Sequence, residues 1–476
     1  MEKSLFDSEA EDSEPAARTE LVQILRSGAV TGMSERSVLA LKTFAVSFLV
    51  GVVVDALLRN TRPGLNVPIL AAVLIAAAMW LAREGRVNPS RASRVVLPAL
   101  MVFAAAFAWR DSATLKILDA VALFAMLSVA FSSCGAYRAR LSSITDYLFN
   151  GITVLLNTLV GSLSLALREV EWRTIRRGRT WRVGLSLASG AALAVPVLLV
   201  FGTLLASADP VFARGMREAV RLQPETLASH LLFAGPIAWI AAGFFRGALT
   251  STQSPITPRP RPSFLSLGAV QVATLLGLVD LLFLGFVIVQ LGYFFGGAER
   301  VEATVGLTYA EYARRGFFEL VAVTALALPL LLGSHWLLRK RSSRDEVVYR
   351  WLAGIMLVLL LVIMASALRR MRLYQSEYGL TELRLYTTAF MLWLGVVFVW
   401  FALTVLYGRR ERFATGAGIA ALAIILALNA LNPDAFIVRT NMSNIRSGYV
   451  FDAQYAASLS SDAVPALVER LDSLGE

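Results

Sequence analysis

Long apolar stretches recur along almost the whole chain. Each runs for roughly 20 residues with few charges, which is the length a helix needs to cross about 30 Å of hydrocarbon. The first begins near Val38 and the last ends near Leu428. A segment in lipid must satisfy its own backbone hydrogen bonds, so helices are the expected form. The sequence therefore predicts an all-α, polytopic helical membrane protein embedded in a lipid bilayer.

We predict about 11 transmembrane helices and one interfacial amphipathic helix. The predicted spans cover residues 38–58, 65–82, 94–109, 113–133, 183–205, 228–248, 268–295, 317–338, 350–368, 385–407 and 413–430. A further apolar stretch, 148–168, carries polar residues three or four positions apart from Asn150 to Arg168, which form one stripe on a helix. Such a helix can lie along the membrane surface. The alternative is a span whose stripe faces the other helices.

The distribution of Lys and Arg favours the interfacial helix. If residues 148–168 do not cross, the loops on the side of the N-terminus carry most of the basic residues, and if they cross the bias almost disappears. The positive-inside rule then places the N-terminus in the cytoplasm and the C-terminus outside it.

Composition narrows the class of protein and its source. The chain is 57% hydrophobic and 17% charged, far more apolar than a soluble domain. Its 41 Arg and 4 Lys exceed its 34 acidic residues by 11, which gives the net charge of +11. The basic residues lie mostly between spans, where they orient the helices in the membrane, so no nucleic-acid partner is predicted. An Ala- and Arg-rich chain is typical of a GC-rich bacterium, so we expect a bacterial plasma (inner) membrane. With Cys134 as the single cysteine and two histidines, no metal site or cofactor is predicted.

The chain divides into five predicted segments. These are a flexible acidic cytoplasmic tail (1–37), a first transmembrane half (38–248), a Pro-rich cytoplasmic linker (249–263), a second transmembrane half (264–430) and an extracytoplasmic C-terminal helical tail (431–476). In the last segment we predict an amphipathic helix that begins at Ser461, with Pro465 in its first turn and its apolar face formed by Val464, Leu467, Val468 and Leu471.

Charged residues inside spans are candidate functional groups, because each is costly in lipid unless it is paired or hydrated. They are Lys42, Asp55, Lys116, Asp119, Asp280 and Glu319. Lys116 and Asp119 are three residues apart, so we predict that they pair. Asp280 lies near the middle of its span, where a short side chain cannot reach water. It is either an ion or proton site or a neutral packing residue.

Two segments at the ends of spans form a second group of candidates. In 307–320 a helix would align Tyr309, Tyr312 and Glu319, with Glu311 beside them and Arg315 one turn before Glu319.

In 372–386 the candidates are Arg372, Tyr374, Glu377 and Tyr378, followed by Gly379 as a helix stop and Thr381 as the next N-cap. The alternative for both segments is an ordinary interfacial aromatic belt.

Catalytic signatures such as His-Glu-x-x-His, Gly-x-Ser-x-Gly and the phosphate-binding Gly-rich loop are missing from the sequence. Asp280 also has no obvious mid-span aspartate partner. An enzyme is therefore disfavoured, although the sequence does not exclude one.

Several of these segments resemble one family. Residues 284–297, 308–320 and 372–386, the Asn-Pro-Asp run ending at Asp434, and 452–467 with Asp462 are similar to the bacterial membrane family called domain of unknown function 4173, which is related to domain of unknown function 4153. The likeness covers roughly residues 200–470. It implies a bacterial multi-pass membrane protein without an assigned activity, and it carries over no catalytic residue. It also makes the extracytoplasmic segments, with Asp434 and Asp462, better candidates than lipid-facing residues.

Two functions stay open from sequence. One is a membrane component of a sensing or envelope system that recognises a membrane or envelope protein partner through its outer face. The other is a transporter-like bundle that moves a small solute or ion past a polar site around Asp280.

Overall fold

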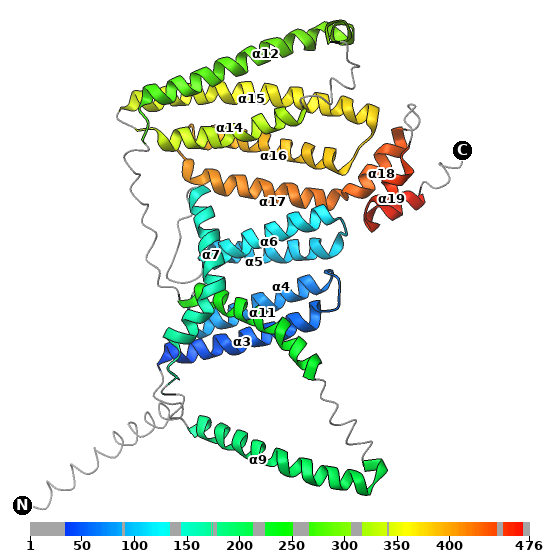
Figure 1. Cartoon of the computed structure of the whole chain (residues 1–476). Coiled ribbons are helices and arrows are strands. Elements are labelled where there is room, and N and C mark those ends of the chain that lie inside the picture. The colour runs from blue at the N-terminus through cyan, green and yellow to red at the C-terminus, as the bar shows by residue number, and fades with distance from the viewer. Residues whose placement is uncertain are drawn as a thin grey trace, which may run out of the picture. The chain divides into compact units, whose positions relative to one another are not determined.

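The computed structural model describes residues 34–87, 91–133, 144–172, 174, 179–212, 224–250, 266–305, 317–339, 342–444 and 451–469 (Figure 1). In these residues every regular element is a helix, and the only other pairing is an isolated parallel bridge between Leu267 and Leu338. The predicted all-α class is confirmed.

Ten helical stretches in this part of the chain are long and apolar enough to cross a membrane. They lie in α3 (Glu35–Leu58), α4 (Asn66–Glu84), α6 (Ala113–Ser133), α7 (Ile144–Ser164) continued by the π-helix η1 (Leu165–Glu169), α11 (Pro224–Thr250), α12 (Ala269–Val305), α14 (Phe317–Leu337), α15 (Ser343–Tyr378), α16 (Glu382–Thr404) and the 3₁₀ turn η3 (Arg410–Arg412) followed by α17 (Phe413–Leu431). Shorter apolar stretches lie in α5 (Arg91–Trp109) and α9 (Arg179–Ala208). The chain is a polytopic helical membrane protein.

The helices group into two compact units that do not follow chain order. Unit 1 contains α3, η1, α9, α11 and parts of α4 and α7, and its main helix pair is α3 with α11. Unit 2 contains α5, α6 and everything from α12 onward, so a hairpin from early in the chain packs with the helices of the second half.

Glycines allow the closest helix approaches in unit 1. A Cβ on Gly243 of α11 would lie 2.3 Å from the carbonyl oxygen of Thr158 in α7, and a Cβ on Gly161 would lie 3.0 Å from that of Gly243. Next to this crossing, the Ser162 hydroxyl donates to the carbonyl of Trp239 at 2.7 Å. The predicted polar stripe of 148–168 therefore faces protein, and not water, at Gly161. Whether this helix crosses the membrane stays a prediction.

Unit 2 is built around α15. Its 36 residues, about 54 Å of helix, pack against α12, α14 and α16, and α17 joins α16 to the α5–α6 hairpin. The largest buried side chains include Tyr349, Met356, Phe398 and Phe401. The Tyr349 hydroxyl donates to the carbonyl of Leu331 at 2.8 Å, as a polar tip inside an apolar core requires.

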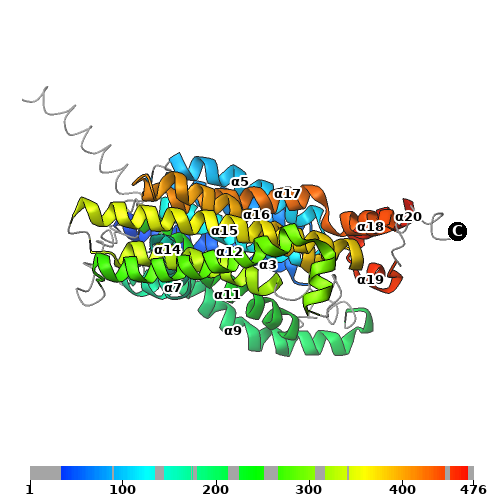
Figure 2. The same cartoon turned by 90° about the horizontal axis from the view of Figure 1, so that it is seen from above.

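A small helical cap follows α17 at one end of unit 2 (Figures 1 and 2). We call α18 (Pro433–Asn444), α19 (Ala453–Ser458), the 3₁₀ turn η5 (Ser461–Ala463) and α20 (Val464–Glu469) the cap, and this end of unit 2 the cap end. Its core contains Ala435, Val438, Met442, Ala463 and Ala466. A final helix with Pro465 in its first turn is confirmed, although it begins at Val464, after a turn capped by Ser460.

The helix ends follow from local residue chemistry. Gly379 ends α15 with φ 72°, a left-handed value that glycine adopts without strain, so the predicted stop is confirmed. Thr381 occupies the N-cap position of α16 but its side chain makes no capping hydrogen bond there. Asn432, with φ 55°, ends α17, and its side chain accepts from the N–H of Ala435 at 3.3 Å, so one residue links α17 to the cap.

We predict that Gly243→Val destabilises unit 1, because its side chain would clash with the α7 backbone near Thr158. Gly235→Val is the matched control, since a Cβ at Gly235 on the same helix meets nothing within 4 Å. The thermal unfolding midpoint of the purified protein in detergent should fall by several degrees for the first variant only. Equal midpoints would contradict the close α7–α11 contact.

Candidate functional site

The cap end of unit 2 gathers polar side chains from elements far apart in the sequence. They come from the start of α6, the start of α16, the end of α17 and the cap, and we call them the cap-end cluster. Its members are Asp111, Ser112, Lys116, Asp119, Glu382, Tyr386, Asn429, Asp434, Asn441, Tyr455, Ser460, Ser461 and Asp462.

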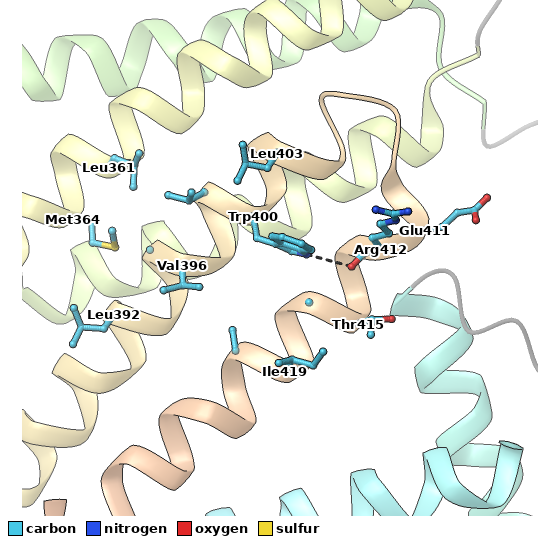
Figure 3. A pocket seen from close by; sticks show the side chains of 14 residues that line it. Leu361, Met364, Leu392, Val396, Trp400, Leu403, Glu411, Arg412, Thr415 and Ile419 are labelled. Carbon is cyan, nitrogen blue, oxygen red and sulfur yellow. Dashed lines mark hydrogen bonds between the residues drawn. The ribbon is translucent and has the colours of Figure 1, made fainter. Parts of the chain in front are cut away.

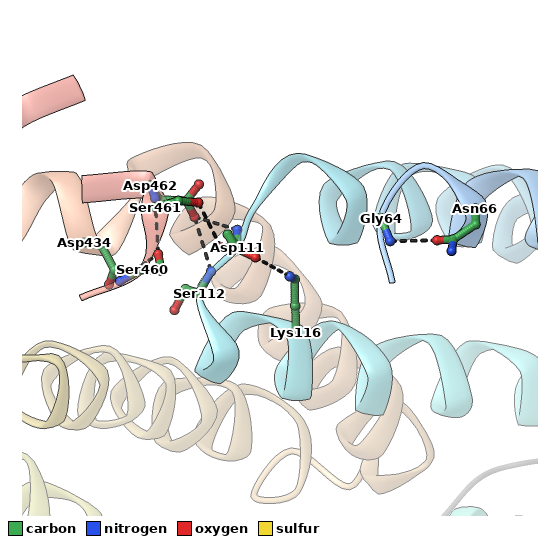
Figure 4. Close-up of polar contacts among 9 residues, drawn as sticks. All are labelled: Gly64, Asn66, Asp111, Ser112, Lys116, Asp434, Ser460, Ser461 and Asp462. Atoms are coloured by element: carbon green, nitrogen blue, oxygen red, sulfur yellow. Dashed lines mark hydrogen bonds and ion pairs between the residues drawn. The ribbon is translucent and has the colours of Figure 1, made fainter. Parts of the chain in front are cut away.

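Asp462 of the cap closes the N-terminus of α6 (Figure 4). Its Oδ2 atom accepts hydrogen bonds from the backbone N–H groups of Asp111, at 2.7 Å, and Ser112, at 3.3 Å. The first N–H groups of a helix lack partners within the helix and carry its positive dipole end. A carboxylate is therefore well suited to this position, although it comes from 350 residues away.

A second contact ties the same two segments together. The Ser461 hydroxyl donates to Asp111 Oδ2 at 2.8 Å, and Lys116 Nζ pairs with Asp111 Oδ1 at 2.6 Å (Figure 4). The predicted Lys116–Asp119 pair is wrong, because Asp111 takes the lysine.

Two further cap side chains hold the turn between α15 and α16. Asn441 accepts from the N–H of Leu380 at 2.6 Å and donates to its carbonyl at 2.8 Å, so one amide satisfies both backbone groups of a buried residue. The Tyr455 hydroxyl accepts from the N–H of Glu382 at 2.8 Å, at the first residue of α16. The cap therefore supplies backbone partners to the starts of both α6 and α16.

Asp434 organises the cap from within. This side chain is 1% exposed, and its Oδ2 atom accepts from the N–H of Ser460, at 3.2 Å, and from the Ser460 hydroxyl. Its other oxygen, Oδ1, has no hydrogen-bond partner in the part of the chain that the structure describes. Asp434 Oδ1 is therefore a buried acceptor that is free to take a further hydrogen bond.

Asp119 lies within α6, about two turns after its N-terminus. It is fully buried and accepts from the Asn429 side chain of α17 at 2.9 Å, while Asp119 Oδ2 and Asn429 Oδ1 are both buried without a partner among the described residues. The backbone carbonyl of Asn429 accepts from Arg110 Nε at 2.6 Å. The α5–α6 hairpin and α17 are thus joined by directed polar contacts.

Negative groups crowd this end. Burial raises the pKa of the Tyr455 hydroxyl, and the nearby Glu382 and Asp434 carboxylates also raise it, so the hydroxyl stays neutral at physiological pH. In the described residues no three His, Cys, Asp or Glu side chains are arranged to hold a metal ion. The unpaired oxygens of Asp119, Asn429 and Asp434 can each accept a further hydrogen bond, and the two carboxylates can also bind a proton.

The residues predicted in 372–386 surround one end of the α15–α16 turn. Arg384 donates to the carbonyls of Tyr378, at 2.9 Å, and Gly379, and its guanidinium lies 4.0 Å from the ring centre of Tyr374. The rings of Tyr374 and Tyr378 are 5.1 Å apart. Arg372 and Glu377 are exposed. The tyrosines thus support the turn that Asn441 holds.

The other predicted segment, 307–320, lies mostly outside the described residues. Tyr309, Glu311, Tyr312 and Arg315 lie outside the described residues, and Glu319 is exposed in the first turn of α14. Their proposed alignment stays a prediction.

Asp280 is buried, at 7% exposure, in α12. Neither of its carboxylate oxygens has a hydrogen-bond partner among the residues that the structure describes.

The two remaining candidate charges of unit 1, Lys42 and Asp55, are paired. Lys42 bonds Glu84 at 2.5 Å, and Asp55 pairs with Arg59 at 3.1 Å and with His230. The Lys42–Glu84 pair joins α3 to α4, and the Asp55–His230 pair joins α3 to α11.

Comparison with known proteins supplies the family. A family model described as Domain of unknown function (DUF4153) matches residues 96–470, which include every member of the cap-end cluster. The chain belongs to this family. The finer likeness to domain of unknown function 4173 is not shown by this match, which is to the related family. No curated protein matches this DUF4153 chain, and no solved structure matches it either.

Sequence reasoning missed Asp111, Asn429, Asn441 and Tyr455 of this DUF4153 chain. A signal exists for one of them: Asn429 is a lone amide near the end of an otherwise apolar span. Asn441 and Tyr455 have no local signal, because the backbone groups that they bond are 61 and 73 residues away. Asp111 lies five residues before Lys116, its ion-pair partner, but its contact with Ser461 leaves no local signal.

We predict that Asn441→Ala loosens the cap, because it leaves the buried N–H and C=O of Leu380 without partners. Each unpaired group lowers the stability of the folded cap by about 1–3 kcal/mol. Hydrogen exchange of the Leu380 amide should become at least tenfold faster. Ser443→Ala is the control, since that exposed hydroxyl bonds only within α18. Unchanged exchange at Leu380 in Asn441→Ala would refute the clamp.

Proposed function

We propose that this integral membrane protein is a component of a sensing or envelope system and engages a protein partner through its cap end. The observation that carries the proposal is the set of directed hydrogen bonds from Asp462, Tyr455 and Asn441 to the starts of α6 and α16. A tail that only anchored the chain would not need them. They couple the position of the cap to two membrane helices.

The free face of the cap supports this proposal. Val464 and Val468, one turn apart on α20, are 51% and 64% exposed, while Ala463 and Ala466 are buried beneath them. Leu467 packs inward, so the described part of the predicted apolar face has a buried and an exposed side, and Leu471 lies outside the described residues. A partner that covers the two valines would bury apolar surface that now faces outward.

The orientation belongs to the proposal as well. The exposed arginines Arg409, Arg410 and Arg412 lie between α16 and α17, at the end opposite to the cap. By the positive-inside rule this end faces the cytoplasm, and the cap faces outward from a bacterial plasma membrane.

A photoreactive residue at Val468 tests the partner in cells. We expect one discrete cross-linked protein species, which also forms from position 464 and is lost when the other valine is replaced by Asp. A photoreactive residue at Ser443, exposed on α18, is the control and should not give it. Identical adducts from all three positions, or none, would contradict the proposal.

A second candidate function is ion or proton movement, favoured by the buried carboxylates. Asp280 has two oxygens and Asp119 has one without described partners. Carboxylates in this state inside a membrane are costly and often mark proton or ion pathways. They are not near each other in sequence, and a pathway between them is part of this candidate.

Asp280→Asn separates this candidate from a packing role. We expect the variant to unfold at a higher temperature, because a neutral amide costs less to bury than an unpaired carboxylate. If Asp280 carries protons, flux into proteoliposomes under an imposed pH gradient should also be lost, whereas Glu319→Gln, an exposed control, keeps it. Equal flux for the wild type, Asp280→Asn and protein-free vesicles would exclude this function.

A further inference from the structure

A lateral groove runs between α15, α16 and α17 in unit 2 (Figure 3). Its volume is about 890 Å³. Side chains of all three helices form its walls, from Leu361 and Met364 on α15, through the α16 face between Leu392 and Leu403, to Ile419 and Ala420 on α17. Because many of these side chains are exposed, the groove opens toward the surface that lipid covers.

The polar lining is confined to one end. Glu411, Arg412 and Thr415 lie where α17 begins, whereas the rest of the lining is apolar apart from the indole N–H of Trp400. That N–H donates to the carbonyl of Arg412 at 3.2 Å (Figure 3). The Thr415 hydroxyl bonds the Tyr147 hydroxyl at 2.9 Å. A molecule that fills this groove must itself be apolar with one polar end.

The length of the groove matches one leaflet. Leu392 and Leu403 are 11 residues apart on α16, which is about 16 Å of helix. The hydrocarbon core of a bilayer is about 30 Å thick, so the apolar part of the groove covers half of it. One acyl chain has this reach.

Small residues keep the floor open. A Cβ on Gly416 would lie 2.0 Å from Trp400 Nε1, so the indole fits only because Gly416 is a glycine. A Cβ on Gly395 would meet the end of the Met364 side chain at 2.8 Å. The groove is therefore shaped by the packing of α15, α16 and α17.

The polar end carries a positive charge. Arg409, Arg410 and Arg412 are exposed there, against the single carboxylate of Glu411. None of the three arginines makes an ion pair with a described residue. Guanidinium groups bind phosphate oxygens through paired hydrogen bonds. These three arginines lie at the end of a membrane span, which is where the headgroup of a lipid beside the span would be.

We propose that this groove binds one acyl chain of an anionic phospholipid, with Arg412 and its two neighbouring arginines holding the headgroup. The occupant follows from the apolar length of one leaflet and the positive end. A zwitterionic lipid would fill the same apolar part but gain less from the arginines. The site does not depend on the partner proposed for the cap.

Native mass spectrometry of the full chain in detergent tests this, with phosphatidylglycerol and phosphatidylcholine of identical acyl chains as probes. We expect the protein to retain one phosphatidylglycerol in preference to phosphatidylcholine. Each arginine near an anionic headgroup contributes roughly fivefold in affinity, so the preference should be at least that large.

Three variants locate the lipid. Arg412→Gln should lower the headgroup preference about fivefold, and Arg344→Gln, an exposed arginine at the first turn of α15 that does not line the groove, should leave it unchanged. Ala420→Phe should abolish retention of both lipids by filling the apolar part. If that variant does not fold, Val399→Trp on the facing helix makes the same test.

Equal retention of the two lipids by the wild type would overturn the proposal. So would an unchanged preference in Arg412→Gln, or full retention in a folded groove-filling variant, since the lipid would then sit elsewhere. Displacement of phosphatidylglycerol by inorganic phosphate alone would show an anion site without a chain and would also overturn it.

Discussion

The starts of two membrane helices in unit 2 receive their hydrogen-bond acceptors from the C-terminal cap. Asp462 serves the segment before α6, and Tyr455 serves the first residue of α16. Helix N-termini have N–H groups that the helix itself cannot satisfy, and near lipid there is little water to replace a lost partner. Two neighbouring contacts extend this arrangement, because Asn441 bonds Leu380 in the α15–α16 turn and Ser461 bonds Asp111 between α5 and α6.

The same contacts give the cap end its chemical character. Short acids and amides bond one another and nearby backbone groups, and one oxygen each of Asp119, Asn429 and Asp434 is buried without a partner among the described residues. Movement of the cap would expose helix ends that are now satisfied and would change the surroundings of these buried carboxylates. A ligand or partner that favours one cap position over another can therefore bias the membrane helices, which is the physical basis of the proposed sensing role.

Local features of the fold were predictable, and long-range ones were not. Most of the predicted spans follow from hydropathy, but those at 94–109 and 183–205 contain only shorter apolar stretches in the described residues. The end of α15 at Gly379 follows from the backbone freedom of glycine. The predicted Lys116–Asp119 pair is wrong because a spacing of three residues on a helix permits an ion pair but does not require one. The Lys116 side chain instead pairs with Asp111, which precedes the helix. Asp434 and Asp462 were found through a family resemblance, yet their partners, 26 and 350 residues away, leave no trace in the local pattern. The polar stripe at Gly161 could be read from sequence, but not the glycine on α11 that meets it.

Cysteine cross-linking in intact cells tests the cap most directly. In a Cys134→Ser background, Asp111→Cys and Ser461→Cys place two thiols where the structure has a 2.8 Å contact, and Asp111→Cys with Ser443→Cys is the matched pair. A membrane-impermeant short bis-maleimide should join the first pair rapidly and the second hardly at all. Equal cross-linking of both pairs, or reaction of the first pair only after the membrane is permeabilised, would contradict a cap fixed over the helix ends on the outer face.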